Sequence, residues 1–384
     1  MLESYVLKFP KVVYSGKDAI SKVGQVVQDF GAAKACIVTD AGLLNRGLCD
    51  RAVEILEGMG IGVEVIKNCP PEPSYLAVQD VVDEFRGMGA DMIVAIGGGS
   101  VMDAAKLISV LATDEYSVKD LLDNPGLAHK QVRTLMVPTT AGTGAEATPN
   151  AIVAVPEKAV KIGIVNDDLI ADAVILDDRM IKDLPRPIAA NTGIDALCHA
   201  IECYTCVKAN PFSDSFALHA LDLIINNVVE ACDRRDAVEA RRAMQLASFY
   251  AGIAITASGT TAVHGLSYPL GGRYHIAHGV SNAMLLVPVM RFNQPAIKER
   301  LASAYDQCVR GDAEGVDAKA EALVDLLDQI VRHLEIPTSV RELGVEDADL
   351  EWLVENGLEQ RRLLDNNVRE LTADDARAIY QQIM

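Results

Sequence analysis

The sequence lacks several features that mark whole classes of protein. No apolar run approaches the roughly 20 residues of a membrane-spanning helix, so we expect no membrane partner. The first residues, MLESYVLKFPKVVYSG, have no basic start followed by an apolar core, and we expect no signal peptide. Eight cysteines among 384 residues are too sparse for a disulfide scaffold, which favours a cytoplasmic location.

Basic residues are also in short supply. Lys and Arg number 35 against 54 Asp and Glu, a net charge of −19. A nucleic-acid-binding protein needs a basic face, so we expect no nucleic acid partner. Half of the residues are hydrophobic, as in a folded globular protein, and the length fits two domains of roughly 150 residues or more.

Short apolar runs alternate with helical patterns in the first half. The strand-like runs are 35–40, 62–66 and 91–100, and residues 134–144 are expected to form a strand followed by a loop. The helical patterns between them include 75–89 and 101–112. Nearly continuous apolar strands separated by helices predict a parallel sheet covered on both faces. We assign residues 1–185 to an α/β dinucleotide-binding domain.

The second half reads almost entirely as helix. The expected helices are 189–206, 213–233, 236–258, 295–309, 317–335 and 372–383, the last opening on a capping box between Thr372 and Asp375. We assign residues 186–384 to an all-α domain. The boundary falls in DLPRP, 183–187, where two prolines interrupt a helix.

Three glycines lie between a strand and a helix in IVAIGGGSVMDAAK. Free backbone N–H groups and the positive end of a helix make such a loop a phosphate site, although a tight turn alone also requires glycine. The loop PTTAGTGAEATPN, 138–150, is rich in hydroxyls and fits either a nucleotide contact or an ordinary capped turn. Asp40, at the end of the first strand, fits either a ribose contact or a helix N-cap.

A candidate metal site lies in NTGIDALCHAIECYTC, 191–206. Asp195 and His199 are four residues apart and therefore share one face of a helix. His264, His275 and His278 lie within 15 residues of one another and bracket a glycine turn. One Asp and three His give a divalent ion four ligands and leave a fifth position for a substrate oxygen.

Cys203 and Cys206 are the rival ligands. They form a lone C-x-x-C in the middle of a helix, with no second pair at the spacing of a zinc ribbon. We interpret them as core packing.

Five motifs together resemble those of the iron-containing, group III alcohol dehydrogenases, a family that includes lactaldehyde reductase and 1,3-propanediol dehydrogenase. They are GGGSVMDAAK, PTTAGTGAE, GIDALCHAIE, HGLSYPLGG and AHGVSNA, in the order that the family has. The resemblance spans essentially the whole chain. It implies a dehydroquinate synthase-like fold, with an N-terminal dinucleotide-binding domain, a helical metal domain and the active site between them.

The resemblance also assigns residues to roles. It places the metal on Asp195, His199, His264 and His278, and NAD on Asp40, Gly97, Gly98, Gly99, Ser100, Asp103, Thr139, Thr140, Thr143, Asn150 and Lys161. Fe2+ is the family's usual metal, and Zn2+ is the alternative that the ligand types leave open. The implied reaction is R–CH2OH + NAD+ ⇌ R–CHO + NADH + H+ on a small primary alcohol, in a dimer or larger oligomer.

The chain departs from the family at the proton relay. The family has a histidine four residues after its third metal ligand, and Tyr268 stands there. Tyr268, His275 or water is left to move the proton. Glu72 replaces a common asparagine, so that cofactor contact is not transferred. Arg273 is either a contact for an anionic substrate or a surface side chain.

Two other functions remain as alternatives. One is an NAD- and zinc-using cyclase of the dehydroquinate synthase type, in which no net NADH appears. The other is a non-catalytic protein that keeps the fold, an idea for which Tyr268 is the only support.

Overall fold

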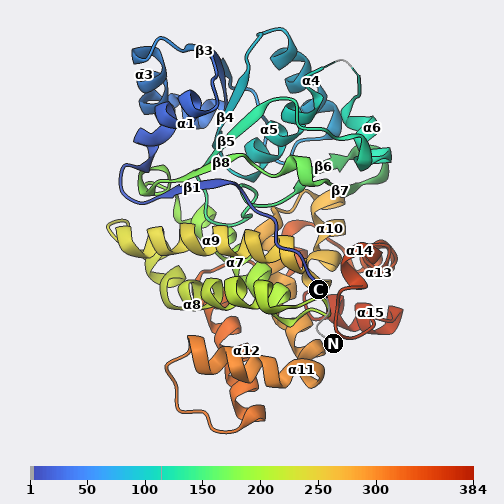
Figure 1. The fold of residues 1–384 in the computed structure, drawn as a ribbon. Helices are drawn as coiled ribbons and strands as arrows, with labels where there is room; N and C mark the ends of the chain where they lie inside the picture. Colours follow the sequence, from blue (N-terminus) through green and yellow to red (C-terminus); the bar gives the residue numbers. More distant parts are fainter. Residues whose placement is uncertain (1–3, 114) are drawn as a thin grey trace. The chain divides into compact units, whose positions relative to one another are not determined.

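The computed structural model describes residues 4–113 and 115–384, which form two compact units (Figure 1). The sheet unit consists of Lys8–Thr140 and Gly144–Leu184. The helical unit consists of residues 4–7, Ala141–Thr143 and Pro185–Met384. Ala141–Thr143, from the hydroxyl-rich loop, therefore belong to the helical unit.

A six-stranded sheet forms the centre of the sheet unit. Its order is β1-β8-β5-β4-β2-β3, and every neighbouring pair is parallel, which confirms the predicted α/β class. The strands are β1 Val12–Ser15, β2 Lys34–Val38, β3 Gly62–Ile66, β4 Met92–Gly97, β5 Arg133–Pro138 and β8 Ala173–Leu176. The helices are α1 Val23–Asp29, α2 Ala41–Asn45, α3 Asp50–Gly58, α4 Tyr75–Arg86, α5 Gly99–Leu111 and α6 Val118–Asp123.

Helices cover both faces of the sheet (Figure 1). Successive side chains of a strand point to opposite faces. In β2, Ala35 and Ile37 pack into the core shared with α1 and α3, whereas the Cys36 thiol meets Met88, just after α4, at 3.7 Å. A strand buried on both sides needs apolar residues throughout, which explains the continuous apolar runs.

A separate antiparallel hairpin follows the hydroxyl-rich loop. It consists of β6 Asn150–Val155 and β7 Val160–Val165. Ala159 closes its turn in the left-handed conformation, with φ of 52°. The sequence prediction did not include β1, β6, β7 or β8.

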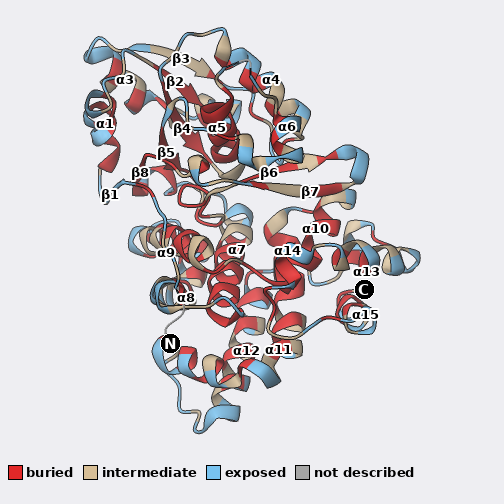
Figure 2. Ribbon diagram, turned by 45° about the vertical axis from the view of Figure 1, so that its right-hand side comes forward, coloured by how far each residue is buried: buried red, intermediate tan, exposed pale blue. Residues whose placement is uncertain are grey.

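The helical unit is all-α, as predicted. Its helices are α7 Arg186–Thr205, α8 Pro211–Asp233, α9 Val238–Ala257, α10 Ala262–Tyr274, α11 His278–Cys308, α12 Val316–His333, α13 Leu350–Leu358, α14 Arg361–Leu364 and α15 Ala373–Gln381. The capping box of Thr372 and Asp375 is confirmed at the start of α15. Residues of α7 and α11 form much of the core (Figure 2).

Two local predictions were wrong. No glycine turn separates His264 from His278, because α10 continues through Gly271 and Gly272 to Tyr274. The chain turns instead at His275, which ends α10 in the left-handed conformation with φ of 55°. The helix expected at 295–309 is the second half of α11, which begins at His278 and contains Pro288 and Pro295.

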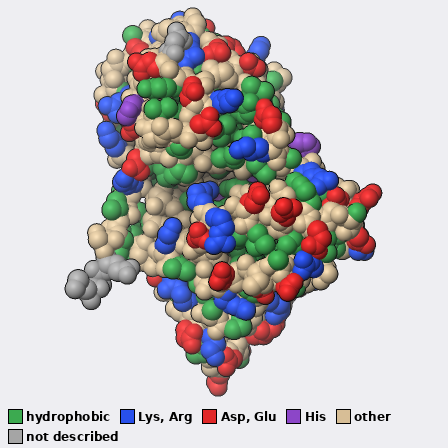
Figure 3. Space-filling model, turned by 90° about the vertical axis from the view of Figure 1, so that its right-hand side faces the viewer, with side chains coloured by type: hydrophobic (Ala, Val, Ile, Leu, Met, Phe, Trp, Pro, Cys, Tyr) green, Lys and Arg blue, Asp and Glu red, His purple; other side chains and the backbone are tan. Residues whose placement is uncertain are grey.

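Acidic and basic side chains are interspersed on the face drawn in Figure 3. Among the described residues, no single helix is long and apolar enough to cross a membrane. The pair α9 and α10, bent by 106°, passes the same test of length and composition only when taken together.

Candidate metal centre

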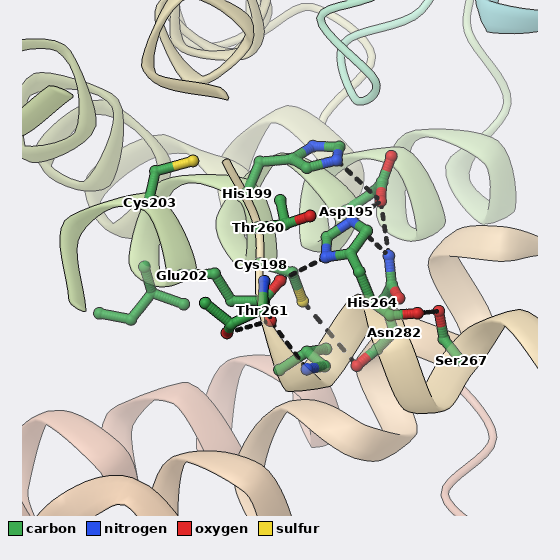
Figure 4. A network of polar contacts seen from close by, with 12 residues as sticks. Asp195, Cys198, His199, Glu202, Cys203, Thr260, Thr261, His264, Ser267 and Asn282 are labelled. Atoms are coloured by element: carbon green, nitrogen blue, oxygen red, sulfur yellow. Dashed lines mark hydrogen bonds and ion pairs between the residues drawn. The ribbon is translucent and has the colours of Figure 1, made fainter. Parts of the chain in front are cut away.

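Three helices bring the four expected metal ligands together. Asp195 and His199 lie one turn apart on α7, His264 lies in the first turn of α10, and His278 is the first residue of α11. One nitrogen or oxygen atom from each side chain lies within 4.8 Å of the other three. Figure 4 shows Asp195, His199 and His264 turned toward one another.

The Asp195 carboxylate is the centre of the group. Its Oδ1 lies 3.5 Å from His278 Nε2, 3.8 Å from His264 Nε2 and 3.9 Å from His199 Nε2. The rings of His199 and His264 stack with their centroids 4.5 Å apart. Each imidazole therefore presents Nε2, not Nδ1, to the carboxylate.

Acceptors behind two of the imidazoles hold them in that orientation. His264 Nδ1 contacts the Glu202 carboxylate, which also accepts from Thr261 Oγ1 at 2.6 Å (Figure 4). His199 Nδ1 lies 3.3 Å from the carbonyl oxygen of Gly142. A proton on Nδ1 satisfies these acceptors and leaves the Nε2 lone pair free for an ion.

Asn282 closes the buried side of the group. Its Nδ2 donates to Asp195 Oδ1 at 2.8 Å and lies 3.2 Å from His264 Nε2 and 3.3 Å from His278 Nε2. An amide NH2 is only a donor, so these contacts also require Nε2 atoms without protons.

Burial and neighbouring charge set the protonation of the ligands. Burial would raise the pKa of Asp195, but the imidazoles of His199, His278 and His264 outweigh it, and the pKa lies below its usual value. Burial lowers the pKa of His199 and favours the neutral ring. Burial also opposes the charge on His264, yet the Glu202 carboxylate prevails and raises that pKa.

This donor set fits a divalent transition-metal ion. One carboxylate and three neutral imidazoles are ligands that Fe2+ and Zn2+ both accept. The acceptors behind the rings are what a histidine ligand needs to keep its orientation. The geometry fits a metal centre but does not choose the metal.

The group is open on the side of His278. That side chain is 27% exposed, whereas the side chains of the other three are at most 7% exposed. The ring of Tyr268 lies beside His278, with centroids 6.1 Å apart. His275 is exposed at the end of α10, and no contact within residues 4–113 and 115–384 joins it to the four ligands.

The rival ligands serve other purposes. Cys203 donates to the carbonyl of Gly259 at 3.4 Å, and Cys206 donates to the carbonyl of Cys203 at 3.5 Å, which agrees with core packing.

Arg273, the candidate contact for an anionic substrate, pairs with Asp349 at 3.2 Å and lies over the Trp352 ring at 4.4 Å. These contacts favour the reading of Arg273 as a surface side chain.

The glycine loop has the form of a phosphate site at the start of α5. Gly98 is the N-cap, and a Cβ there would lie 3.4 Å from the Thr140 side chain. A Cβ on Gly97 would lie 2.5 Å from Val101, so this position requires glycine. Thr139 N–H donates to the Gly97 carbonyl at 2.9 Å, which joins the two loops at the carboxyl ends of β4 and β5.

The other expected cofactor residues already have partners in the protein. Asp40 Oδ1 caps α2 by accepting from Leu43 N–H at 2.9 Å, and Lys161 pairs with Glu72 at 2.9 Å. Asp103 accepts a hydrogen bond from Ile152 N–H at 3.1 Å and lies 3.6 Å from Lys106 Nζ. The carbonyl of Asn150 accepts from Lys106 Nζ at 2.6 Å. Ser100 Oγ accepts a hydrogen bond from Glu72 N–H at 2.9 Å. Gly99 is the first residue of α5. Thr143 belongs to the helical unit, unlike the other expected cofactor residues.

Comparison with known proteins covers nearly the whole chain. Residues 10–178 match the family described as iron-containing alcohol dehydrogenase, and residues 189–384 match the C-terminal part of the Fe-containing alcohol dehydrogenase family. The chain belongs to the iron-containing alcohol dehydrogenases. It is therefore an oxidoreductase, and neither the cyclase nor the non-catalytic alternative is favoured.

Relatives of this dehydrogenase agree in sequence and in fold. Long-chain-alcohol dehydrogenase 1 of Geobacillus thermodenitrificans is 34% identical over 379 residues, 97% of this chain and 95% of the relative. The crystal structure of a 1,3-propanediol oxidoreductase covers 100% of both chains with a TM-score of 0.95 and 32% identity. Sulfoacetaldehyde reductase from Bifidobacterium kashiwanohense, solved in complex with NAD+, gives a TM-score of 0.88 at 26% identity, covering 100% of this chain and 99% of that one.

Sequence reasoning missed the residues that orient the ligands. Glu202 and Asn282 both stand within the motifs that carried the resemblance, and a Glu among the apolar residues of a helix was the available signal. The carbonyl of Gly142 carried no signal, because a backbone contact does not depend on residue type. Arg362, discussed below, lies far along the chain from every motif around the ligands.

Proposed function

We propose that this dehydrogenase interconverts a small primary alcohol and its aldehyde, with NAD(H) and a divalent ion held by Asp195, His199, His264 and His278. The observation that carries the proposal is the convergence of one carboxylate and three imidazoles, with acceptors behind two of the rings. When bound, the ion supplies Lewis acidity that polarises a carbonyl or lowers the pKa of an alcohol. Fe2+ is the proposed ion, and Zn2+ is the alternative.

Tyr268 is the proposed proton-bearing group of the reaction. Burial raises its pKa, so its hydroxyl keeps the proton at neutral pH and can donate a hydrogen bond to a substrate oxygen. It lies beside His278, on the open side of the ligands. His275 is the weaker candidate because it is exposed and without contact to the four among the described residues.

NAD(H) is proposed as the hydride carrier. The start of α5 would hold the pyrophosphate through Gly97, Gly98, Gly99 and Ser100, where backbone N–H groups lie at the positive end of the helix. The remaining contacts proposed are Asp40, Asp103, Thr139, Thr140, Thr143, Asn150 and Lys161. The relative solved with NAD+ supports the choice of cofactor.

Location and assembly are also proposals. All eight cysteines are free and buried, as expected in a reducing cytoplasm, and the family resemblance suggests a homodimer or larger oligomer. The names of the relatives include a long-chain alcohol, a diol and a sulfonated aldehyde, so they do not select one substrate.

The test is to purify the protein anaerobically, strip it of metal and follow NADH absorbance at 340 nm with short aldehydes. Fe2+ and Zn2+ are added back separately. We expect metal-dependent NADH consumption that is abolished in His264→Ala and retained in His129→Ala, a matched change at an exposed histidine. Absence of turnover with every metal and aldehyde would contradict the proposal.

A further inference from the structure

An arginine lies next to the open side of the candidate metal centre. It is Arg362, on the short helix α14, which packs on α10 at Gly265, the residue after His264. A Cβ on Gly265 would lie 3.0 Å from Leu364 Cδ2 and 3.6 Å from Leu363 Cβ. Leu363 and Leu364 are buried, while Arg362 is exposed.

The position of α14 is fixed at its end. Asn366 donates to the carbonyls of Ser258 at 2.9 Å and Thr260 at 3.1 Å, in the loop that leads into α10. Asn366 itself is buried. Arg362 is therefore presented from a backbone attached to the same helix that carries His264 and Tyr268.

The side chain of Arg362 reaches toward the ligands. The positive charge of its guanidinium acts on the pKa of both Tyr268 and His264, so the group lies near both side chains. Tyr268 in turn lies against His278, the ligand on the open side.

Arg362 differs from neighbouring arginines in having no carboxylate partner within the part of the chain that the structure describes. Arg361 pairs with Asp365, and Arg273 pairs with Asp349. A guanidinium carries five N–H donors in a fork that matches carboxylate, sulfonate or phosphonate oxygens, and Tyr268 offers a single oxygen. Donors therefore remain for an anion that arrives from solvent.

We propose that Arg362 binds an anionic group at the far end of the substrate, so that the preferred substrate is a short aldehyde or alcohol bearing a carboxylate, sulfonate or phosphonate. This inference rests on the proposed function, because it takes the reacting oxygen to bind at the four ligands. An uncharged substrate of the same length would leave the guanidinium without a matched partner in the complex.

The test compares charged and uncharged aldehydes in one assay. The probes are 2-oxoethanesulfonate, 2-oxoethylphosphonate and 4-oxobutanoate, set against propanal and butanal, with NADH and the metal-loaded protein. The quantity measured is the ratio of kcat/KM for a charged probe to kcat/KM for the uncharged probe nearest in length. The three charged probes distinguish which anion the site accepts.

We expect the ratio to exceed one in the wild type. In Arg362→Met it should be about 10- to 100-fold lower, the effect of losing one charge-assisted hydrogen bond. Arg362→Lys should give an intermediate ratio, because lysine keeps the charge and loses the fork. Arg361→Met is the matched control, and its ratio should equal that of the wild type. Calorimetric binding of 2-hydroxyethanesulfonate, weaker in Arg362→Met, gives a readout independent of turnover.

Two results would overturn this inference without affecting the proposed function. The first is a wild-type kcat/KM ratio of one or less, and the second is an equal loss of kcat/KM on charged and uncharged probes in Arg362→Met. The second would mean that Arg362 only supports Tyr268. Metal-dependent turnover of propanal or butanal would still uphold the proposed function in both cases. Absence of turnover on every probe would instead overturn the proposed function, and this inference with it.

Discussion

At the scale of single residues, the candidate metal centre depends on side chains that would never touch the ion. A histidine binds metal through a nitrogen without a proton, so the acceptor behind its other nitrogen selects the useful tautomer. Glu202 performs this role for His264 and is itself held by Thr261 and by Val263 N–H at 2.8 Å. Glu202 is fully buried, and both Thr261 and Val263 donate hydrogen bonds to its carboxylate.

We predict that Glu202→Gln lowers metal affinity about 10- to 100-fold, the usual effect of removing such a partner. The amide keeps the shape of the carboxylate but must turn one NH2 donor toward His264 Nδ1 or toward the N–H groups of Thr261 and Val263. If the NH2 group faces His264, the histidine proton must move to Nε2. If it faces Thr261 and Val263, their N–H groups meet another donor and lose their hydrogen bonds. Competition of the protein with a chelator of known affinity, with metal content measured, gives the result.

Cys203→Ala is the control, because Cys203 is the next residue on the same buried helix and does not contact His264. Its metal affinity should match the wild type. An unchanged affinity in Glu202→Gln would show that packing, not the tautomer, orients His264.

Residue types and spacing named the four ligands in advance but not their partners. Asp195 and His199 share a helix face whatever the tertiary arrangement. The close spacing of His264 and His278 supplied the other two ligands, and the resemblance pointed to the same set. Arg362 was not named, because its nearness to Tyr268 depends on how α14 packs against α10. Arg273 was named and lies instead against Trp352 and Asp349.

At the scale of elements, the rhythm of apolar residues predicted β2, β3, β4 and β5 and most of the helices. It failed where packing outweighs local preference. Two glycines cost a helix about 1 kcal/mol each, yet α10 passes through Gly271 and Gly272. The prolines at 288 and 295 also lie inside α11, so the start of that helix was predicted too late.

The approach of α11 to α7 depends on one glycine. A Cβ on Gly279 would overlap the carbonyl of Asn191, which is backbone of α7 and cannot move aside as a side chain would. Gly279 follows His278, and Asn191 lies one turn before Asp195. The distance between two ligands is therefore set by the absence of a side chain.

We predict that Gly279→Ala lowers both stability and metal affinity. Forcing the helices apart should cost about 1–3 kcal/mol in the free energy of unfolding, as overpacking does, and should separate His278 from Asp195. Chemical denaturation and chelator competition measure the two effects. Gly58→Ala is the control, since a Cβ at the end of α3 meets nothing within 4 Å. Wild-type metal affinity in Gly279→Ala would show that the site tolerates the shift.

At the scale of the whole molecule, buried charge opposes the stability that the two cores provide. Lys106 is fully buried below the glycine loop, with Asp103 at 3.6 Å and Thr148 Oγ1 at 3.0 Å. Glu146 is buried nearby, and its Oε1 has no hydrogen-bond partner within the described residues. Asp103 follows the glycine loop and Glu146 lies within the hydroxyl-rich loop, but the burial of both carboxyl groups was known only from the structure.

Glu146 makes the stability of the chain depend on pH. Burial raises its pKa from 4.5 to about 7. Between these values the folded state keeps a proton that the unfolded state has lost. The contribution of Glu146 is therefore most favourable below pH 4.5, falls as pH rises through 7 and is constant above that, a loss of about 3 kcal/mol in all.

We predict that Glu146→Gln removes this loss. The neutral amide resembles the protonated acid, so the variant and the wild type should unfold at similar temperatures at pH 5, while at pH 8 the variant should be more stable by up to about 3 kcal/mol. Thermal and denaturant unfolding at the two pH values measure the difference. Glu57→Gln, on the exposed face of α3, should show no change with pH relative to the wild type. The free energy of unfolding of Glu146→Gln could instead differ from that of the wild type by the same amount at both pH values. That result would mean that Glu146 is ionised throughout, held by the charge of Lys106.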